Sequence, residues 1–281
     1  MFFQLFRMQQ WYKNILVFLP LVFAGLLLDP KSIILTFLGF LSLCLMSSTN
    51  YILNDIIDKE KDKAHPEKKG RPLASGEVSL TLAVFLAILL ATLSLILASF
   101  LSEIFFVLLL IFFFLTQLYS LYFKEEIFAD IIFISTNFVI RAMAGSFILD
   151  IRLSPWLIIC TFFLSLFIAV GKRKADLSLL KSKANDHKKV LQDYEINLTN
   201  TLMTITTTAL LVSYSLYSFL SIYPQLIYSL PFALYVILRY FYICENKTNI
   251  ARHPEQFYKD TRLLLGIILW GLLVIFLLYY I

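Results

Sequence analysis

The sequence predicts an all-α polytopic membrane protein: nine transmembrane helices in one bundle, with cytosolic cap loops after helices 2 and 6. Three observations lead to this fold class. Of the 281 residues, 59% are hydrophobic and only 15% are charged, whereas about a quarter of an average soluble domain is charged. The mean hydropathy is +0.80. Uncharged runs near the roughly 20 residues that cross a bilayer recur along the chain.

The expected spans follow these runs in order: 14–28, 32–54, 80–102, 104–123, 131–149, 153–171, 196–238 and 263–281. The seventh run is too long for one helix, and Pro224 near its middle divides it into two spans, which makes nine. The first run is short, but Trp11 and Tyr12 extend it as aromatic residues at the membrane interface. A single charge, Arg141, interrupts the fifth run.

Basic residues gather on one side of the expected bundle. Nine spans place the N-terminus and the loops after spans 2, 4, 6 and 8 on the same side, and every Lys and Arg except Lys31, Arg141 and Arg152 lies there. Cytosolic segments of membrane proteins carry such an excess. We therefore expect a multi-pass protein of the inner membrane whose N-terminus and site face the cytosol. The net charge of +5 reflects this topology and does not indicate a nucleic-acid partner.

The two long charged loops on that side, 55–79 and 172–197, are the expected caps. The first opens with three aspartates: if helix 2 continues past the membrane, Asp55, Asp58 and Asp62 lie on one helical face, at i, i+3 and i+7. Three such carboxylates repel one another unless divalent cations lie between them. Carboxylates are ligands for Mg²⁺, which completes its shell with substrate phosphates.

Basic residues follow the aspartates, among them Lys68, Lys69 and Arg71. Lys and Arg suit phosphate oxygens, and Arg can bind them with two hydrogen bonds. The loop therefore predicts a magnesium–diphosphate site, with Asn54 at the membrane edge as a further ligand or orienting group. The alternative is a solvated acidic and basic helix end that only obeys the charge rule of membrane topology.

The stretch NDIIDKEKD…GRPLASG, from residue 54, resembles the NDxxDxxxD signature of the UbiA superfamily of intramembrane prenyltransferases. Three further stretches resemble its decaprenyl-phosphate phosphoribosyltransferase branch: QWYKNILVFLPLVFAG at 10–25, RAMAGSFILDIRLSPW at 141–156 and FIAVGKRKADLSLL at 167–180. The resemblance covers essentially the whole chain. It implies one domain over 1–281, a nine-helix bundle with the two caps, and a role in cell-envelope biogenesis.

The second cap departs from the pattern of family members that prenylate aromatic acceptors. Those carry a second DxxxD motif after helix 6, whereas this chain has Asp176 but leucine at position 180. The loop is instead basic, with Lys172, Arg173 and Lys174. This departure weakens a second aspartate-held magnesium and fits a substrate with an additional phosphate.

The resemblance implies transfer of 5-phosphoribose from phosphoribosyl diphosphate (PRPP) to a polyprenyl phosphate, with Mg²⁺ as cofactor and release of pyrophosphate. Asp55, Asp58 and Asp62 would hold the metal. The residues implied to bind phosphates are Lys13, Arg71, Lys124, Arg141, Lys172 and Arg173, with Asp176 as a possible second motif. The implied partners are PRPP, the lipid phosphate and the bilayer, and homo-oligomerisation stays open.

Arg141 is expected to face the bundle interior, because a charge at the bilayer centre costs about 2.5–3.5 kcal/mol. It would bind a lipid or donor phosphate, or form an ion pair with Asp130 or Asp150. Lys124 would bind phosphate or lie at the membrane interface.

Two other functions compete with the phosphoribosyltransferase. The first is a UbiA-type enzyme that moves a prenyl group from a prenyl diphosphate to an aromatic acceptor. The second is a transporter, which the near absence of charges within the spans disfavours. The histidines, His65, His187 and His253, form no nucleophile–base pattern, and the cysteines, Cys44, Cys160 and Cys244, are expected to be packing residues.

Overall fold

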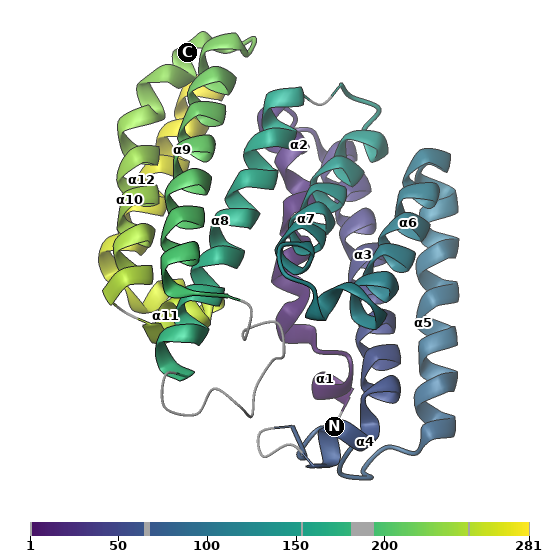
Figure 1. The fold of residues 1–281 in the computed structure, drawn as a ribbon. Coiled ribbons are helices and arrows are strands. Elements are labelled where there is room, and N and C mark those ends of the chain that lie inside the picture. Colours follow the sequence, from purple (N-terminus) through teal and green to yellow (C-terminus); the bar gives the residue numbers. More distant parts are fainter. Residues whose placement is uncertain (1, 65–67, 153, 181–193, 247, 281) are drawn as a thin grey trace. The chain divides into compact units, whose positions relative to one another are not determined.

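The computed structural model describes residues 2–64, 68–152, 154–180, 194–246 and 248–280, and within these ranges all regular secondary structure is helical. Eight helical segments in the described chain are long and apolar enough to cross a membrane. They are α3 (Pro30–Ile57), α5 (Leu80–Leu101), α6 (Glu103–Leu121), α7 (Ala129–Ile148), α8 (Pro155–Leu180), α9 (Ile196–Leu220), η5 with α10 (Pro224–Ser229 and Leu230–Asn246) and α12 (Thr261–Tyr279) (Figure 1). The protein is an integral membrane protein, as predicted.

The first expected span differs from the other eight. It consists of a 3₁₀ helix, η1 (Met8–Phe18), and a short helix, α2 (Leu19–Phe23), which follow α1 (Phe2–Leu5). Pro20 lies at the start of α2, where a missing N–H is tolerated. Gly25 takes a left-handed backbone with φ of 74°, so the helix ends before residue 28. The count of nine spans stays a prediction.

The chain divides into two compact units. The first comprises Met1–Leu121 with Ile140–Arg152, and the second comprises Tyr122–Val139 with Leu153–Ile281. Helix α7 therefore contributes its first half to the second unit and its second half to the first.

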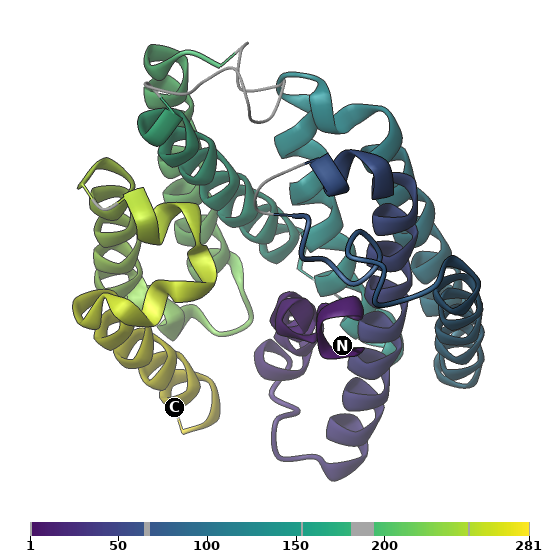
Figure 2. The same cartoon turned by 90° about the horizontal axis from the view of Figure 1, so that it is seen from below.

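In the first unit, α3 packs along α5, and the N-terminal segment lies against α3 (Figure 2). Ser42 and Ser94 fasten α3 to α5 through reciprocal hydrogen bonds: the Ser42 hydroxyl donates to the Ser94 carbonyl (2.9 Å) and the Ser94 hydroxyl to the Ser42 carbonyl (2.7 Å). Small residues at such an interface allow helices to approach closely within a membrane. The close packing fixes the helix that carries the aspartates.

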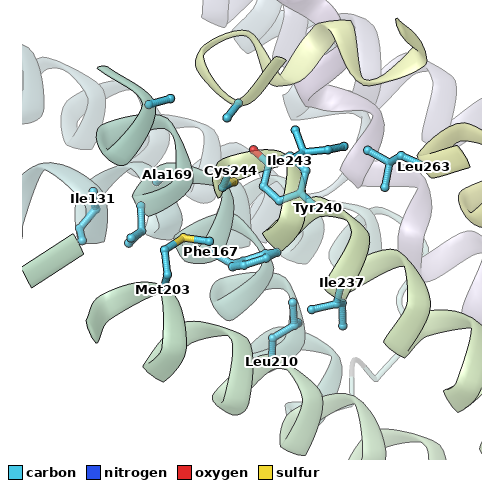
Figure 3. Packing of buried hydrophobic residues seen from close by; sticks show 13 residues of the cluster. Ile131, Phe167, Ala169, Met203, Leu210, Ile237, Tyr240, Ile243, Cys244 and Leu263 are labelled. Carbon is cyan, nitrogen blue, oxygen red and sulfur yellow. The ribbon is translucent and has the colours of Figure 1, made fainter. Parts of the chain in front are cut away.

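The core of the second unit lies between α8, α9, α10 and α12 (Figure 3). Phe167 of α8 and Tyr240 of α10 meet edge to face with ring centroids 5.3 Å apart. A Cβ atom on Gly171 would lie 2.6 Å from the Cys244 sulfur, so α8 and α10 approach closely at this glycine. Cys44, Cys160 and Cys244 are all buried free thiols, consistent with their expected packing role.

A second close approach, in the first unit, holds η1 against α7. A Cβ atom on Gly145 would lie 2.0 Å from the backbone carbonyl oxygen of Val17. Backbone cannot move aside as a flexible side chain can, so only glycine fits here. This contact places the N-terminal segment that supplies several site residues.

We expect Gly145→Ala to destabilise the protein by about 1–3 kcal/mol, the usual range for an overpacked core. The matched control is Gly271→Ala in α12, where the described part of the chain has no atom within 4 Å of an added Cβ. Alanine there should raise stability by up to about 1 kcal/mol because it favours the helix. Melting temperatures of both variants in one detergent test this, and equal melting temperatures would contradict the close approach.

Candidate functional site

One face of α3 is polar where the N-terminal segment packs on it. Its residues are spaced at helical intervals: Cys44, Ser47, Ser48, Tyr51 and Asp55. The Trp11 indole N–H donates to the Ser48 hydroxyl (3.1 Å), which donates to the Phe6 carbonyl (2.8 Å). The Asn14 amide donates to the Ser47 hydroxyl (3.3 Å). These bonds fix the segment on α3 beside the aspartates.

Two of the predicted aspartates are buried and share one cation. Asp55 and Asp62 are 3% and 2% exposed. Nη1 of Arg71 lies 3.0 Å from Oδ1 of Asp55 and 2.5 Å from Oδ2 of Asp62. Lys68 adds a second positive charge, with Nζ 3.7 Å from Asp62 Oδ1. The structure thus brings together four of the residues that the sequence predicted to form a site: Asp55, Asp62, Lys68 and Arg71.

Asp58 lies at a bend between α3 and α4 (Lys59–Ala64). The expectation that the three aspartates extend from one straight helix was therefore wrong. Its backbone, with φ of −87° and ψ of 3°, caps α3. Helical hydrogen bonds nevertheless continue through the bend. The Asp58 N–H donates to the Asn54 backbone carbonyl (2.9 Å), and the Asp62 N–H donates to the Asp58 backbone carbonyl (2.8 Å). Asn54 is half-buried. The chain therefore turns without unwinding, and Asp55 and Asp62 meet at Arg71.

The donor set fits a magnesium ion that a substrate completes. Among the residues described, no group of three acidic, histidine or cysteine side chains converges as a ready-made metal cage. Mg²⁺ is usually bound through one or two carboxylates, with waters and substrate phosphates filling the other positions. Asp55 and Asp62 supply two such carboxylates. Arg71 and Lys68 lie beside these carboxylates and would provide positive charge for the phosphate oxygens of a substrate.

Arg7 is a site residue that sequence reasoning missed. Its guanidinium bonds Asp55 Oδ1 and lies 4.8 Å from the centroid of the Tyr51 ring. Its backbone has φ of 46° and ψ of 47°, a left-handed conformation that residues other than glycine rarely adopt. Strain of this kind concentrates at functional sites. The one signal in the sequence was its place on the basic side of the expected topology.

Arg141 faces the interior of the first unit, as expected for a charge within a span. It is 7% exposed, its Nε donates to Oδ1 of Asn14 (2.8 Å), and its guanidinium lies 4.6 Å from the Phe112 ring centroid. Asp130, one of its expected alternative partners, is bonded elsewhere. Lys13 is half-buried beside Asn14, in the segment that packs on α3.

In the second unit, the fully buried Asp130 accepts two hydrogen bonds. Arg173, 4% exposed, donates from Nε to Oδ2 (2.6 Å), and the Tyr194 hydroxyl donates to Oδ1 (2.8 Å). The Phe128 N–H donates to the same hydroxyl (3.2 Å). Burial and the negative charge of Asp130 raise the pKa of Tyr194 well above its usual range. The tyrosine therefore stays protonated and keeps donating to the carboxylate.

The predicted residues of the second cap belong to ion pairs within this unit. Asp176 accepts from Arg252 Nε (3.1 Å) and lies 3.8 Å from Arg173 Nη1, while Lys174 pairs with Glu245. Two other predicted lysines, Lys124 and Lys172, are half-buried. Two sequence-based expectations lie outside the described residues: those for His65 and for His187.

Family and sequence comparisons agree with one another. The model of the UbiA prenyltransferase family matches residues 16–258. A decaprenyl-phosphate phosphoribosyltransferase of Mycolicibacterium smegmatis is 35% identical over 217 residues, which is 76% of this chain and 68% of that protein. The protein of the same name from Corynebacterium glutamicum is 34% identical over 218 residues, 76% of this chain and 65% of that protein.

Solved structures share the fold at low sequence identity. A UbiA homologue from Archaeoglobus fulgidus bound to GPP and Mg²⁺ aligns with a TM-score of 0.71 and 20% identity, over 97% of this chain and 98% of that one. A structure of digeranylgeranylglyceryl phosphate synthase aligns with a TM-score of 0.65 and 19% identity, over 95% and 96% of the two chains. At these identities the likeness shows the fold alone.

We expect Asp130→Ala to destabilise the protein by about 3 kcal/mol or more, because it leaves the buried Arg173 guanidinium without its main counter-charge. Glu60→Ala is the matched control, since Glu60 forms an exposed pair with Lys63 (2.8 Å) that should add little. Thermal unfolding in detergent compares the two. An Asp130→Ala protein that melts like Glu60→Ala would show that the buried network does not stabilise the fold.

Proposed function

The chain belongs to the UbiA prenyltransferase family, and from this premise we propose that it transfers 5-phosphoribose from PRPP to a polyprenyl phosphate, with Mg²⁺ and with release of pyrophosphate. One observation carries the proposal: Asp55 and Asp62 are buried side by side around Arg71, with Arg7 and Lys68 next to them. The relatives that are 31–35% identical and named decaprenyl-phosphate phosphoribosyltransferase support the choice of substrates.

The first unit would bind the diphosphate of the donor. Asp55 and Asp62, with Asp58 at the bend, would hold the metal, and Asn54 would orient or complete the set. The metal would neutralise charge on the departing pyrophosphate. Arg71 already lies between two carboxylates, so a small movement of its side chain would turn its remaining donors toward phosphate oxygens.

The reaction exchanges one bond at the anomeric carbon of the ribose. The bond from that carbon to the diphosphate oxygen breaks, and pyrophosphate leaves with the electron pair. An oxygen of the lipid phosphate attacks from the opposite face and forms the new bond, with inversion. A phosphate monoester is already ionised at neutral pH. The nucleophile therefore needs no strong general base, which agrees with the lack of a nucleophile–base pattern around the histidines.

The roles that we propose for the other site residues rest on the resemblance to the family. Lys13, Lys124, Arg141, Lys172 and Arg173 would add positive charge for phosphates, with Asp176 as the remnant of a second motif. We also propose that the whole chain forms a single domain in the inner membrane. Its N-terminus and its site would lie on the cytosolic side. A water-soluble, highly anionic donor would reach a basic cytosolic face directly.

The test is a transfer assay on detergent-purified protein. With Mg²⁺, a polyprenyl phosphate and PRPP labelled in the ribose, label should pass into the organic phase, and chelation of the metal should stop it. Asp58→Asn should lower the rate about 100-fold or more. Glu60→Gln, which changes an exposed acid in α4, should retain the wild-type rate.

Two outcomes would overturn the proposal. Transfer that persists in Asp58→Asn or without metal would remove the aspartates from the reaction. Prenylation of an aromatic acid from a prenyl diphosphate, without any transfer of labelled ribose, would keep the metal site but replace the substrates with those of the competing enzyme class.

A separate kinetic prediction concerns the contact of Arg7 with Asp55. Arg7→Gln should raise KM for PRPP about tenfold or more, the loss expected for one hydrogen bond to a charged group. Arg7→Lys should fall between this variant and the wild type. The exposed Arg152, replaced by Gln, serves as the control and should keep the wild-type KM. An unchanged KM in Arg7→Gln would limit Arg7 to holding the N-terminal segment on α3.

A further inference from the structure

Tyr194 lies just before α9 and contacts the start of α7. Its hydroxyl accepts a hydrogen bond from the Phe128 N–H (3.2 Å) and donates one to Oδ1 of Asp130 (2.8 Å). The tyrosine is 3% exposed, and its ring meets the Phe128 ring edge to face, with centroids 6.3 Å apart. One phenol therefore joins the first residues of α7 to the residue that precedes Glu195, the N-cap of α9.

The backbone donor in this contact has an unusual conformation. Phe128 has φ of 64°, in the left-handed region that residues with bulky side chains rarely adopt. Such a conformation persists only where the surrounding structure enforces it. Here the bond from its N–H to the Tyr194 hydroxyl and the contact between the two rings hold it. The hydroxyl thus has a fixed place between a backbone donor and the Asp130 carboxylate.

The hydroxyl affects how Asp130 can hold Arg173. A carboxylate and a guanidinium frequently form two parallel hydrogen bonds, which use both carboxylate oxygens. Here Arg173 donates from Nε to Oδ2 (2.6 Å), while the Tyr194 hydroxyl donates to Oδ1. The second oxygen that a two-bond pair would need is therefore already engaged by the phenol.

The terminal nitrogens of Arg173 meet a different carboxylate. Nη1 lies 3.8 Å from Oδ2 of Asp176, which is longer than a hydrogen bond. Asp176 also accepts from Arg252 Nε (3.1 Å), so its charge is shared between two cations. The bond at Nε is thus the short one, and the longer contact at Nη1 is easier to exchange for a phosphate oxygen. Arginine can bind phosphate with two hydrogen bonds.

We propose that Tyr194 is a positioning residue that, by engaging Oδ1 of Asp130, keeps Arg173 bound through Nε and its terminal nitrogens directed toward a substrate phosphate. This inference rests on the proposed function, in which Arg173 adds positive charge for phosphates. Without the hydroxyl, Asp130 would take Arg173 into a two-bond pair, and fewer donors would remain for the ligand. The role does not depend on whether ribose or a prenyl group is transferred, because both donors carry a diphosphate.

The test measures the dissociation constants of two probes, PRPP and inorganic pyrophosphate, with the purified full chain in detergent and Mg²⁺. Tyr194→Phe removes only the hydroxyl and keeps the ring beside Phe128. It should weaken binding of at least one probe about tenfold, the loss expected for one hydrogen bond to a charged group. Tyr258→Phe, at an exposed tyrosine of the same unit, is the matched control and should bind like the wild type.

A double-mutant cycle separates positioning from a general loss of stability. Arg173→Lys keeps a positive charge beside Asp130 but lacks the planar fork of the guanidinium, so it should itself bind the probe more weakly. In that background Tyr194→Phe should weaken binding further by no more than about twofold, because the group that it positions is gone. A tyrosine that only stabilises the fold would lower the melting temperature and leave the dissociation constants unchanged.

The positioning role is overturned if neither probe binds the wild type, if Tyr194→Phe binds both like the wild type, or if the tenfold loss persists in the Arg173→Lys background. Should Tyr194→Phe not fold, Arg173→Lys still tests the role: wild-type binding of both probes would remove Arg173 from the ligand. Failure of the proposed function looks different. Pyrophosphate binding that responds as expected in a protein that does not bind PRPP would preserve the role of Tyr194 and reject only the ribose donor.

Discussion

Two carboxylates buried at the end of a membrane-spanning helix require positive charge beside them, and this requirement organises the first unit. Asp55 and Asp62 share the guanidinium of Arg71, which the chain delivers by turning back after α4. Arg7 reaches Asp55 from the other direction and ties the N-terminal segment to α3. Cations that neutralise the carboxylates in this way are also placed for phosphate oxygens, so one arrangement serves both stability and the proposed binding of a diphosphate.

The second unit uses the same physical principle for a different purpose. Asp130 is fully buried and is matched by Arg173 and the Tyr194 hydroxyl, while Asp176 is matched by Arg252. These pairs join the start of α7, the end of α8 and α11 (Thr248–Arg252). Arg173 and Asp176, for which we propose a role at the substrate, therefore also form ion pairs within this unit. We infer that the network stabilises the second unit and that the first unit holds the metal.

The sequence predicted what depends on local pattern. Eight spans follow from uncharged runs, and the grouping of Asp55, Asp62 and Arg71 follows from helical spacing and a short return loop. The contact of Arg7 with Asp55 joins residues 48 positions apart, and that of Arg141 with Asn14 joins residues 127 apart. Such pairs depend on how helices pack and have no local signature. The interrupted first span has the same origin, since side-chain bonds to α3 hold η1 in place.

The central claim is that the aspartates bind a metal–diphosphate whose organic part is a phosphorylated ribose. The most direct measurement compares binding of PRPP and geranyl diphosphate to the same purified protein, with and without Mg²⁺. The account predicts that PRPP binds only with Mg²⁺, that Asp62→Asn abolishes this binding, and that geranyl diphosphate does not displace PRPP. Binding of PRPP that is independent of the metal, or tight metal-dependent binding of geranyl diphosphate without any of PRPP, would contradict it.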